Sequence, residues 1–176
     1  MTPDLNRPPA RPLAMPPGTG IAPDPTKKTI PHTPSQGTTQ TRSASGESLI
    51  LNAIQACETN LADYGVRAMV THTEAFGEFL ARDAKLKTTQ VRRFLDAIKR
   101  LKTELAKSNE FSSIEIEVLL LKPKVAYTAA RHKSAKSFSN VITAAIDKVN
   151  DRASFIRLTQ LIESIIAYHK AFGGQD

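Results

Sequence analysis

The sequence of 176 residues contains one cysteine, Cys57, and no tryptophan. A single cysteine excludes an intramolecular disulfide and fits a reducing compartment, so we expect a cytoplasmic protein. Apolar runs are also short, since none exceeds about four residues, as at 118–121, whereas a membrane-spanning helix needs about 20. The sequence therefore predicts a soluble protein with no membrane partner.

Proline is nearly absent from most of the chain, because ten of the eleven prolines lie within residues 3–34. This segment has little apolar surface to bury, and its Pro, Thr, Ser and Gly content favours an extended, solvated chain. Prolines follow Arg7 and Arg11 where a signal peptide would need an apolar stretch. We expect a disordered tail over residues 1–46 and one folded domain over residues 47–176.

Acidic residues are scarce in two segments of the expected domain. Residues 82–107 hold nine basic and three acidic residues, and residues 122–136 hold five basic residues and no acid. Residues 47–81 hold five acids and one base, although the whole chain has a net charge of +7. This segregation favours a basic surface that faces a polyanion. A solvated helix face that keeps the protein soluble is the alternative.

Residues that catalyse reactions or bind metals are not grouped in the sequence. The four histidines lie far apart and have no cysteine or second histidine at ligand spacing. His72 and Glu74 are two positions apart and do not face each other on a helix, and His169 is expected to pack rather than to act as a base. The sequence also has no glycine-rich phosphate loop and no G-x-S-x-G motif. We expect no enzymatic activity, no cofactor and no metal.

The clearest helix is predicted over residues 85–107, KLKTTQVRRFLDAIKRLKTELAK. Its apolar residues recur at steps of three and four, which places them on one face. Thr88 or Thr89 is the expected N-cap. Basic residues that include Arg92 and Arg93 fall on the opposite face. The expected buried residues are Val91, Phe94, Leu95, Ile98, Leu101 and Leu105.

Further helical patterns cover residues 48–64, 66–83, 138–149 and 151–172, and two shorter ones meet at Pro123. Gly65 is expected to end the first of these helices, and Lys122 to end a helix because a proline follows it. Pro123 then suits the first turn of the next helix. No stretch alternates as a strand would. The sequence predicts an all-α fold, a small helical bundle of five to six helices with a disordered N-terminal tail.

Aromatic side chains fall mostly on the apolar stripes, and Tyr127 and Tyr168 are counted among them. The basic face then has no evident aromatic platform on which a nucleobase could stack. If the basic residues bind nucleic acid, we expect them to contact phosphates.

Three segments together resemble a known family: KLKTTQVRRF at 85–94, LLLKPKVAYTAAR at 119–131 and ESIIAYHKAFGG at 163–174. They are similar to the small subunit, the second Csm protein, of the type III-A CRISPR-Cas Csm effector complex. The resemblance covers about residues 69–174, and the tail has no counterpart. The matching positions are Leu86, Gln90, Arg92, Arg93, Phe94, Lys122, Pro123, Ala126, Tyr127, Arg131, Ala167, Tyr168 and Lys170.

The resemblance implies a non-catalytic structural subunit of an RNA-guided antiviral complex. Such subunits are helical bundles that associate head to tail in an inner filament, beside the backbone subunit and between the large polymerase-like subunit and the cap subunit. Their basic face lies along the guide RNA and target RNA and binds the backbone without sequence specificity. Pro123, Tyr127 and Tyr168 are expected to pack. The expected RNA contacts are Lys85, Lys87, Gln90, Arg92, Arg93, Lys124, Arg131, Lys133 and Lys136.

Two other functions stay open at this point. The chain could be a helical protein-interaction scaffold with no nucleic-acid role, whose positive face meets an acidic partner or solvent. A DNA-binding regulator is less favoured, because the junction at residues 86–90 lacks the glycine turn of a helix-turn-helix.

Overall fold

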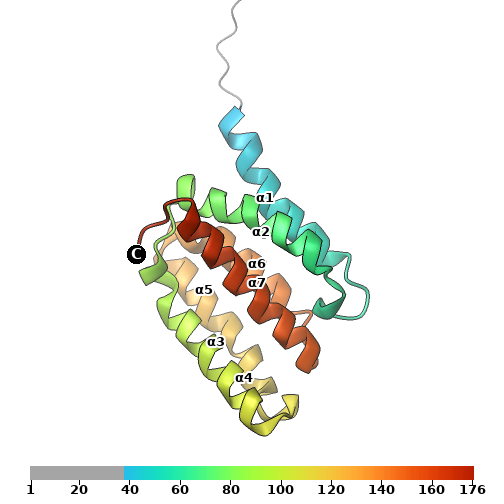
Figure 1. Ribbon diagram of the computed structural model, residues 1–176. Helices are drawn as coiled ribbons and strands as arrows, with labels where there is room; N and C mark the ends of the chain where they lie inside the picture. Colours follow the sequence, from blue (N-terminus) through green and yellow to red (C-terminus); the bar gives the residue numbers. More distant parts are fainter. Residues whose placement is uncertain (1–37) are drawn as a thin grey trace, which may run out of the picture. The chain divides into compact units, whose positions relative to one another are not determined.

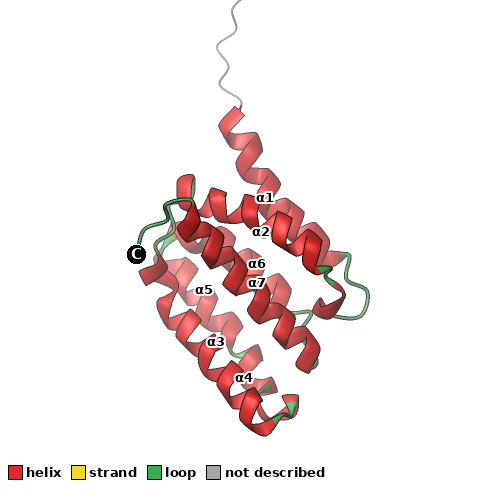
Figure 2. Cartoon of the chain, in the orientation of Figure 1, coloured by secondary structure: helices red, strands yellow, loops and turns green. Residues whose placement is uncertain are grey.

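The computed structural model describes residues 38–176, with side chains from residue 46 onward. This part is built from helices and contains no strand, which confirms the all-α prediction (Figures 1 and 2). The expected boundary at residue 47 falls inside the first helix, and most of the predicted tail lies outside the described residues. The helices are α1 (Thr38–Gln55), α2 (Val66–Arg82), α3 (Thr88–Ser108), α4 (Glu115–Leu119), α5 (Leu121–Arg131), α6 (Lys136–Ile146) and α7 (Arg152–Ala171).

The last helix, α7, lies at the centre of the bundle. It packs most extensively against α2 and also contacts α3 and α6, while α5 lies against both α3 and α6 (Figure 1). Its apolar residues cover two adjacent ridges of the helix, so it can bury side chains against several neighbours at once. The helix is deeply buried, since five of its residues are at most 1% exposed: Phe155, Leu158, Leu161, Ile162 and Ile165.

The contact between α2 and α7 is close at Gly77. A Cβ atom at this position would lie 2.6 Å from the Cβ of Tyr168 and 2.8 Å from the backbone nitrogen of His169. No side chain fits in that space, so the glycine allows the two helices to approach each other.

The predicted helix over residues 48–64 is wrong in its second half. α1 ends at Gln55, and Gly65 is the N-cap of α2 rather than the end of a helix. The intervening Asn60 is buried, and its side-chain Nδ2 donates to the carboxylate of Asp151 at 3.0 Å. The backbone N–H of Leu61 donates to a carbonyl of the α6–α7 loop at 2.7 Å. These contacts with a distant loop outweigh the local preference for helix in this segment.

The expected helix end at Lys122 is also wrong. α5 begins at Leu121, so Pro123 is its third residue and Lys122 lies inside the helix. The N–H groups of the first helical turn have no acceptor within the helix, and a proline there removes no hydrogen bond. Pro123 therefore occupies the first turn, as predicted, although two positions after the first residue of the helix.

The start of α3 differs from the expected threonine cap. Lys87 occupies the N-cap position, and its backbone N–H donates to the side-chain Oε1 of Gln90 at 3.0 Å. Thr88 is already helical, and its backbone N–H donates to the carbonyl of Gln175 at 2.9 Å. The C-terminal segment of the chain thus supplies an acceptor for the first N–H group of the helix.

Candidate nucleic-acid interface

A groove of about 690 Å³ lies between α3 and α5. The apolar stripe of α3 anchors one wall, because the ring of Phe94 meets Phe138 of α6 edge to face at a centroid distance of 5.8 Å. The buried side chain of Val125 anchors α5 on the opposite wall. Side chains next to these anchors on each helix consequently point into the groove or along its rim.

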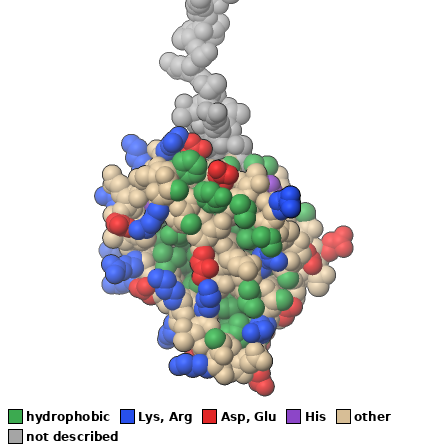
Figure 3. Space-filling model, in the orientation of Figure 1, with side chains coloured by type: hydrophobic (Ala, Val, Ile, Leu, Met, Phe, Trp, Pro, Cys, Tyr) green, Lys and Arg blue, Asp and Glu red, His purple; other side chains and the backbone are tan. Residues whose placement is uncertain are grey.

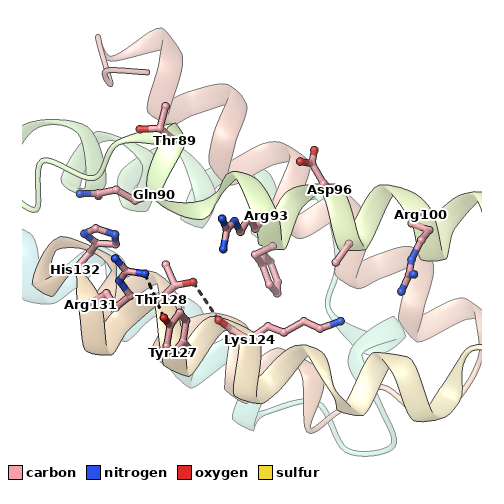
Figure 4. A pocket seen from close by; sticks show the side chains of 12 residues that line it. Thr89, Gln90, Arg93, Asp96, Arg100, Lys124, Tyr127, Thr128, Arg131 and His132 are labelled. Carbon is pink, nitrogen blue, oxygen red and sulfur yellow. Dashed lines mark hydrogen bonds between the residues drawn. The ribbon is translucent and has the colours of Figure 1, made fainter.

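Four of the predicted RNA contacts line this groove: Gln90, Arg93, Lys124 and Arg131. Figure 4 shows Arg93 extending from α3 toward α5, and Lys124 lying along α5 in the direction of Arg100. Two helices that are separated by a loop and a short helix in the sequence thus bring their cations to one place.

The three groove cations have no carboxylate partner among the described side chains. Arg93, Lys124 and Arg131 form none of the ion pairs found in residues 46–176. Arg100 differs, because its guanidinium is paired with Glu117 of α4. Unpaired cations on a concave surface attract an anionic ligand more strongly than cations that are already neutralised.

One carboxylate lies at the groove. Asp96 is part of its lining, but in the view of Figure 4 its side chain extends from the side of α3 that is turned away from α5. The groove is therefore positive on the side of α5 and mixed in charge along the outer edge of α3.

The other predicted contacts are exposed, but they do not line the groove. A hydrogen bond from Lys170 is the main cause that lowers the pKa of the Asp176 carboxyl near the C-terminus, and the charge of Arg92 contributes to the same shift. On the face shown in Figure 3, Lys and Arg side chains are spread over the surface, with acidic side chains between them. The predicted residues outside the groove are Lys85, Lys87, Arg92, Lys133 and Lys136.

Gln90 has a structural role that the sequence did not reveal. Its Oε1 accepts hydrogen bonds from the backbone N–H of Lys87 at 3.0 Å and from the hydroxyl of Ser134 at 2.8 Å. These bonds hold the start of α3 against the loop before α6. The oxygen is occupied by the fold, so the NH₂ group is the part of this side chain that can donate to a ligand.

The interpretation of Tyr127 as a packing residue is wrong. Its side chain is 61% exposed and lines the groove beside Arg131. Pro123 is exposed as well, whereas Tyr168 is half-buried and stacks on Phe172. A helical wheel could have placed Tyr127 correctly, because it lies three residues after Lys124 and off the face that carries Val125. Arg100, Thr128 and His132 also line the groove, although no sequence pattern pointed to them.

The other titratable side chains considered in the sequence have structural partners. His72 shares a 2.8 Å hydrogen bond with the Tyr64 hydroxyl, whose pKa is raised by burial. His169 is fully buried and donates from Nε2 to the carbonyl of Leu86 at 2.7 Å.

No group of three or more His, Cys, Asp or Glu side chains within the described residues could hold a metal ion. No helix within residues 38–176 is long and apolar enough to cross a bilayer.

Comparison with known families gives a match that includes the whole groove. The family model for Csm2 Type III-A matches residues 63–175, well over half of the chain. The chain belongs to the type III-A Csm2 family. This confirms the resemblance on which the sequence analysis relied.

A Csm2-family relative is the protein described as "CRISPR system Cms protein Csm2" from Streptococcus thermophilus. It is 28% identical to this chain over 93 residues, which cover 52% of this chain and 76% of the relative. No solved structure matches the chain significantly.

Proposed function

We propose that this Csm2-family protein is a non-catalytic structural subunit of a type III-A CRISPR RNA-guided antiviral effector complex. In this proposal the α3/α5 groove binds the phosphate backbone of the guide RNA and target RNA without sequence specificity, and the subunit acts in the cytoplasm. Membership of the Csm2 family supports the complex, and the three unpaired cations of the groove support the RNA contact. The groove is the observation that carries the proposal.

Phosphate recognition fits the chemistry of the groove. Arginine presents a planar set of donors that can bind a phosphate through two hydrogen bonds, and lysine adds a mobile point charge. Such contacts fix the position of a strand but do not read its bases. The exposed Lys85, Lys87, Arg92, Lys133 and Lys136 would extend the contact along the strand beyond the groove.

The partner part of the proposal concerns the other subunits of the complex and further copies of this chain. Head-to-tail association needs two different complementary patches. Exposed apolar side chains occur on α4 and at its C-cap, where Ile116, Leu119 and Leu120 are 73%, 52% and 51% exposed. A second set, Leu49, Val66 and Val70, lies on α1 and α2. These two surfaces are candidates for contacts with a second copy and with the large, backbone or cap subunit.

The RNA contact is tested in the assembled complex by combining Arg93→Ala with Lys124→Ala. The matched control combines Lys99→Ala with Lys107→Ala, which removes two exposed cations of α3 that do not line the groove. Affinity for target RNA is measured over a series of salt concentrations. Each phosphate contact contributes about 0.7 to the slope of log affinity against log salt, so the groove variant should lose about 1.4 of slope.

The control pair should change the slope less than the groove pair. Equal changes for the two pairs would mean that net charge, rather than the groove, determines binding. Wild-type affinity of the groove variant at every salt concentration would contradict the proposal. That result would favour a protein-interaction scaffold, for which the exposed apolar residues of α4 would be the contact surface.

A further inference from the structure

Tyr127 presents an aromatic ring inside a positively charged groove. It lies on α5 between Lys124 and Arg131, which both line the same groove, and its side chain is 61% exposed. Large aromatic side chains dominate the energetics of protein cores and interfaces, because they bury so much apolar surface. An exposed ring among unpaired cations is therefore the feature of this site that phosphate binding does not explain.

The fold does not use the ring of Tyr127 for packing. The residues that attach α5 to the core are Leu121 and Val125, which are fully buried. The four ring pairs found within residues 46–176 do not include this tyrosine. Its specific contacts are both with Arg131, one turn further along the helix.

Two contacts join Arg131 to Tyr127, one to the hydroxyl and one to the ring. The Nη1 of Arg131 donates to the Tyr127 hydroxyl at 3.2 Å, and the guanidinium carbon lies 5.7 Å from the ring centroid. That distance is near the outer limit of a cation–π contact, and it places the guanidinium toward the hydroxyl end of the ring. The pair orients the ring and the guanidinium together beside the groove (Figure 4), and most of the tyrosine stays exposed.

We propose that Tyr127 is a stacking platform for an unpaired nucleobase of the bound RNA, and that Arg131 and Lys124 bind phosphates beside that base. This inference rests on the proposed function and adds to it a preference for a class of ligand. Aromatic rings stack on any base, so the contact does not require a particular sequence. A base inside a continuous duplex is stacked on its neighbours, and recognition by aromatic stacking therefore targets unpaired or displaced bases.

The size of the groove is compatible with this ligand. Its volume of about 690 Å³ lies within the range of about 300–1,000 Å³ that is typical of small-molecule sites. Lys124 precedes the tyrosine by nearly one turn and Arg131 follows it by one turn, so cations flank the ring on both sides along α5. A base on the ring would place the neighbouring sugar-phosphate groups within the groove.

The test compares Tyr127→Leu, which removes the ring, with Tyr127→Phe, which keeps the ring and removes only the hydroxyl. The probes are a single-stranded oligouridine and a fully paired RNA duplex with the same number of phosphates, bound to the full-length chain at low salt. We expect Tyr127→Leu to bind the single strand about tenfold more weakly, because one base-aromatic stack is lost. Tyr127→Phe should bind it like the wild type, and neither variant should change duplex binding or the salt slope.

A second readout detects the stack directly. An oligonucleotide that contains 5-iodouridine forms a covalent bond with an aromatic ring that lies against the base on irradiation. Mass spectrometry should find the cross-link at Tyr127 in the wild type and at the same position in Tyr127→Phe, but not in Tyr127→Leu. A cross-link confined to other residues would overturn the inference.

The outcomes separate this inference from the function on which it rests. If Arg93→Ala with Lys124→Ala weakens binding and Tyr127→Leu does not, the groove binds phosphates only and the stacking inference is overturned. If Tyr127→Phe is as weak as Tyr127→Leu, the hydroxyl positions Arg131 and the ring does not stack, which also overturns it. If neither the tyrosine nor the cations affect RNA binding, the proposed function fails as well.

Discussion

The contact between α2 and α7 depends on the absence of a side chain at Gly77. Alanine is favoured over glycine within a helix by up to about 1 kcal/mol, so α2 in isolation would gain stability from Gly77→Ala. The new Cβ atom would nevertheless lie 2.6 Å from the Cβ of Tyr168. Because overpacking of this kind costs about 1–3 kcal/mol, we expect a net loss in the free energy of unfolding. Urea denaturation measures the change.

Gly65→Ala is the matched control for this substitution. A Cβ atom at Gly65 would have no other atom within 4 Å, so the change introduces no clash, and it should cost only the difference between glycine and alanine as N-cap residues, about 0.5–1 kcal/mol. If Gly77→Ala were as stable as Gly65→Ala, α2 and α7 would have to pack less closely than the distances at Gly77 indicate.

Asp151 caps the start of α7 in a way that depends on pH. Its carboxylate accepts from the backbone N–H of Ser154 at 2.7 Å and also from the Asn60 side chain at 3.0 Å. The hydrogen bonds from Ser154, followed by the bond from Asn60, lower the pKa of this carboxyl from its usual value of 3.8. The stabilisation is therefore fully present above about pH 4 and is lost as the pH falls through the lowered pKa of the folded state.

We expect Asp151→Ala to lower the free energy of unfolding by about 0.5–2 kcal/mol at neutral pH, because the cap is removed. The difference from the wild type should decrease as the pH falls below about 4, where the wild-type carboxyl also becomes neutral. Denaturant unfolding at a series of pH values measures both effects. A difference that stays constant down to pH 3 would mean that the charge of Asp151 does not stabilise the helix.

At the scale of helices, a carboxylate of α4 neutralises one of the cations that α3 places at the groove. Glu117 of α4 is paired with Arg100, which lines the groove. Both side chains are partly exposed, so breaking the pair should change stability by less than about 1 kcal/mol. Releasing Arg100 should nevertheless strengthen RNA binding, because its guanidinium would then be available to a phosphate.

We therefore expect Glu117→Gln to raise the affinity of the assembled complex for RNA and to steepen its salt dependence. Glu115→Gln is the control, because it removes an equal charge from the same helix at an exposed residue that forms no ion pair within the described part of the chain. Affinity over a salt series measures the effect. Equal gains for the two variants would indicate long-range electrostatics, and no gain for Glu117→Gln would mean that Arg100 does not reach the RNA.

The helices themselves were largely predictable, since local periodicity decides which residues share a face. The buried stripe of α3 matches the predicted one, apart from Leu95, which is only partly buried. The ends of the helices were less predictable. Asn60 and Leu61 follow a helical pattern, yet their hydrogen bonds reach the loop before α7. Leu119 is apolar but 52% exposed, because α4 is a short helix of five residues.

For the whole molecule, stability should be unevenly distributed between α7 and α4. α7 is buried along most of its length, whereas Val118 is the buried residue of the five-residue α4. Segments with few buried contacts open locally, while core helices exchange their amide hydrogens only through larger unfolding. We expect native-state hydrogen exchange to be slowest in the middle of α7 and faster by orders of magnitude in α4.

Hydrogen exchange of the assembled complex extends this prediction. If a partner covers the exposed Ile116, Leu119 and Leu120, exchange in α4 should slow on assembly, while α7 should change little. Exchange in the free chain that is equally slow in α4 and α7 would contradict the uneven distribution of stability.

The sequence by itself determined the helical class, the buried face of each long helix and the membership of the Csm2 family. These features depend on residue spacing and residue type, which can be read along the chain. Only the tertiary structure decided which basic residues share a groove, and it placed Arg93 with Lys124 and Arg131 but left Arg92 near the C-terminal segment. It also decided that Tyr127 faces the groove. The physical reason is that a groove between α3 and α5 requires two helices to pack side by side, and periodicity within one helix does not specify its neighbour.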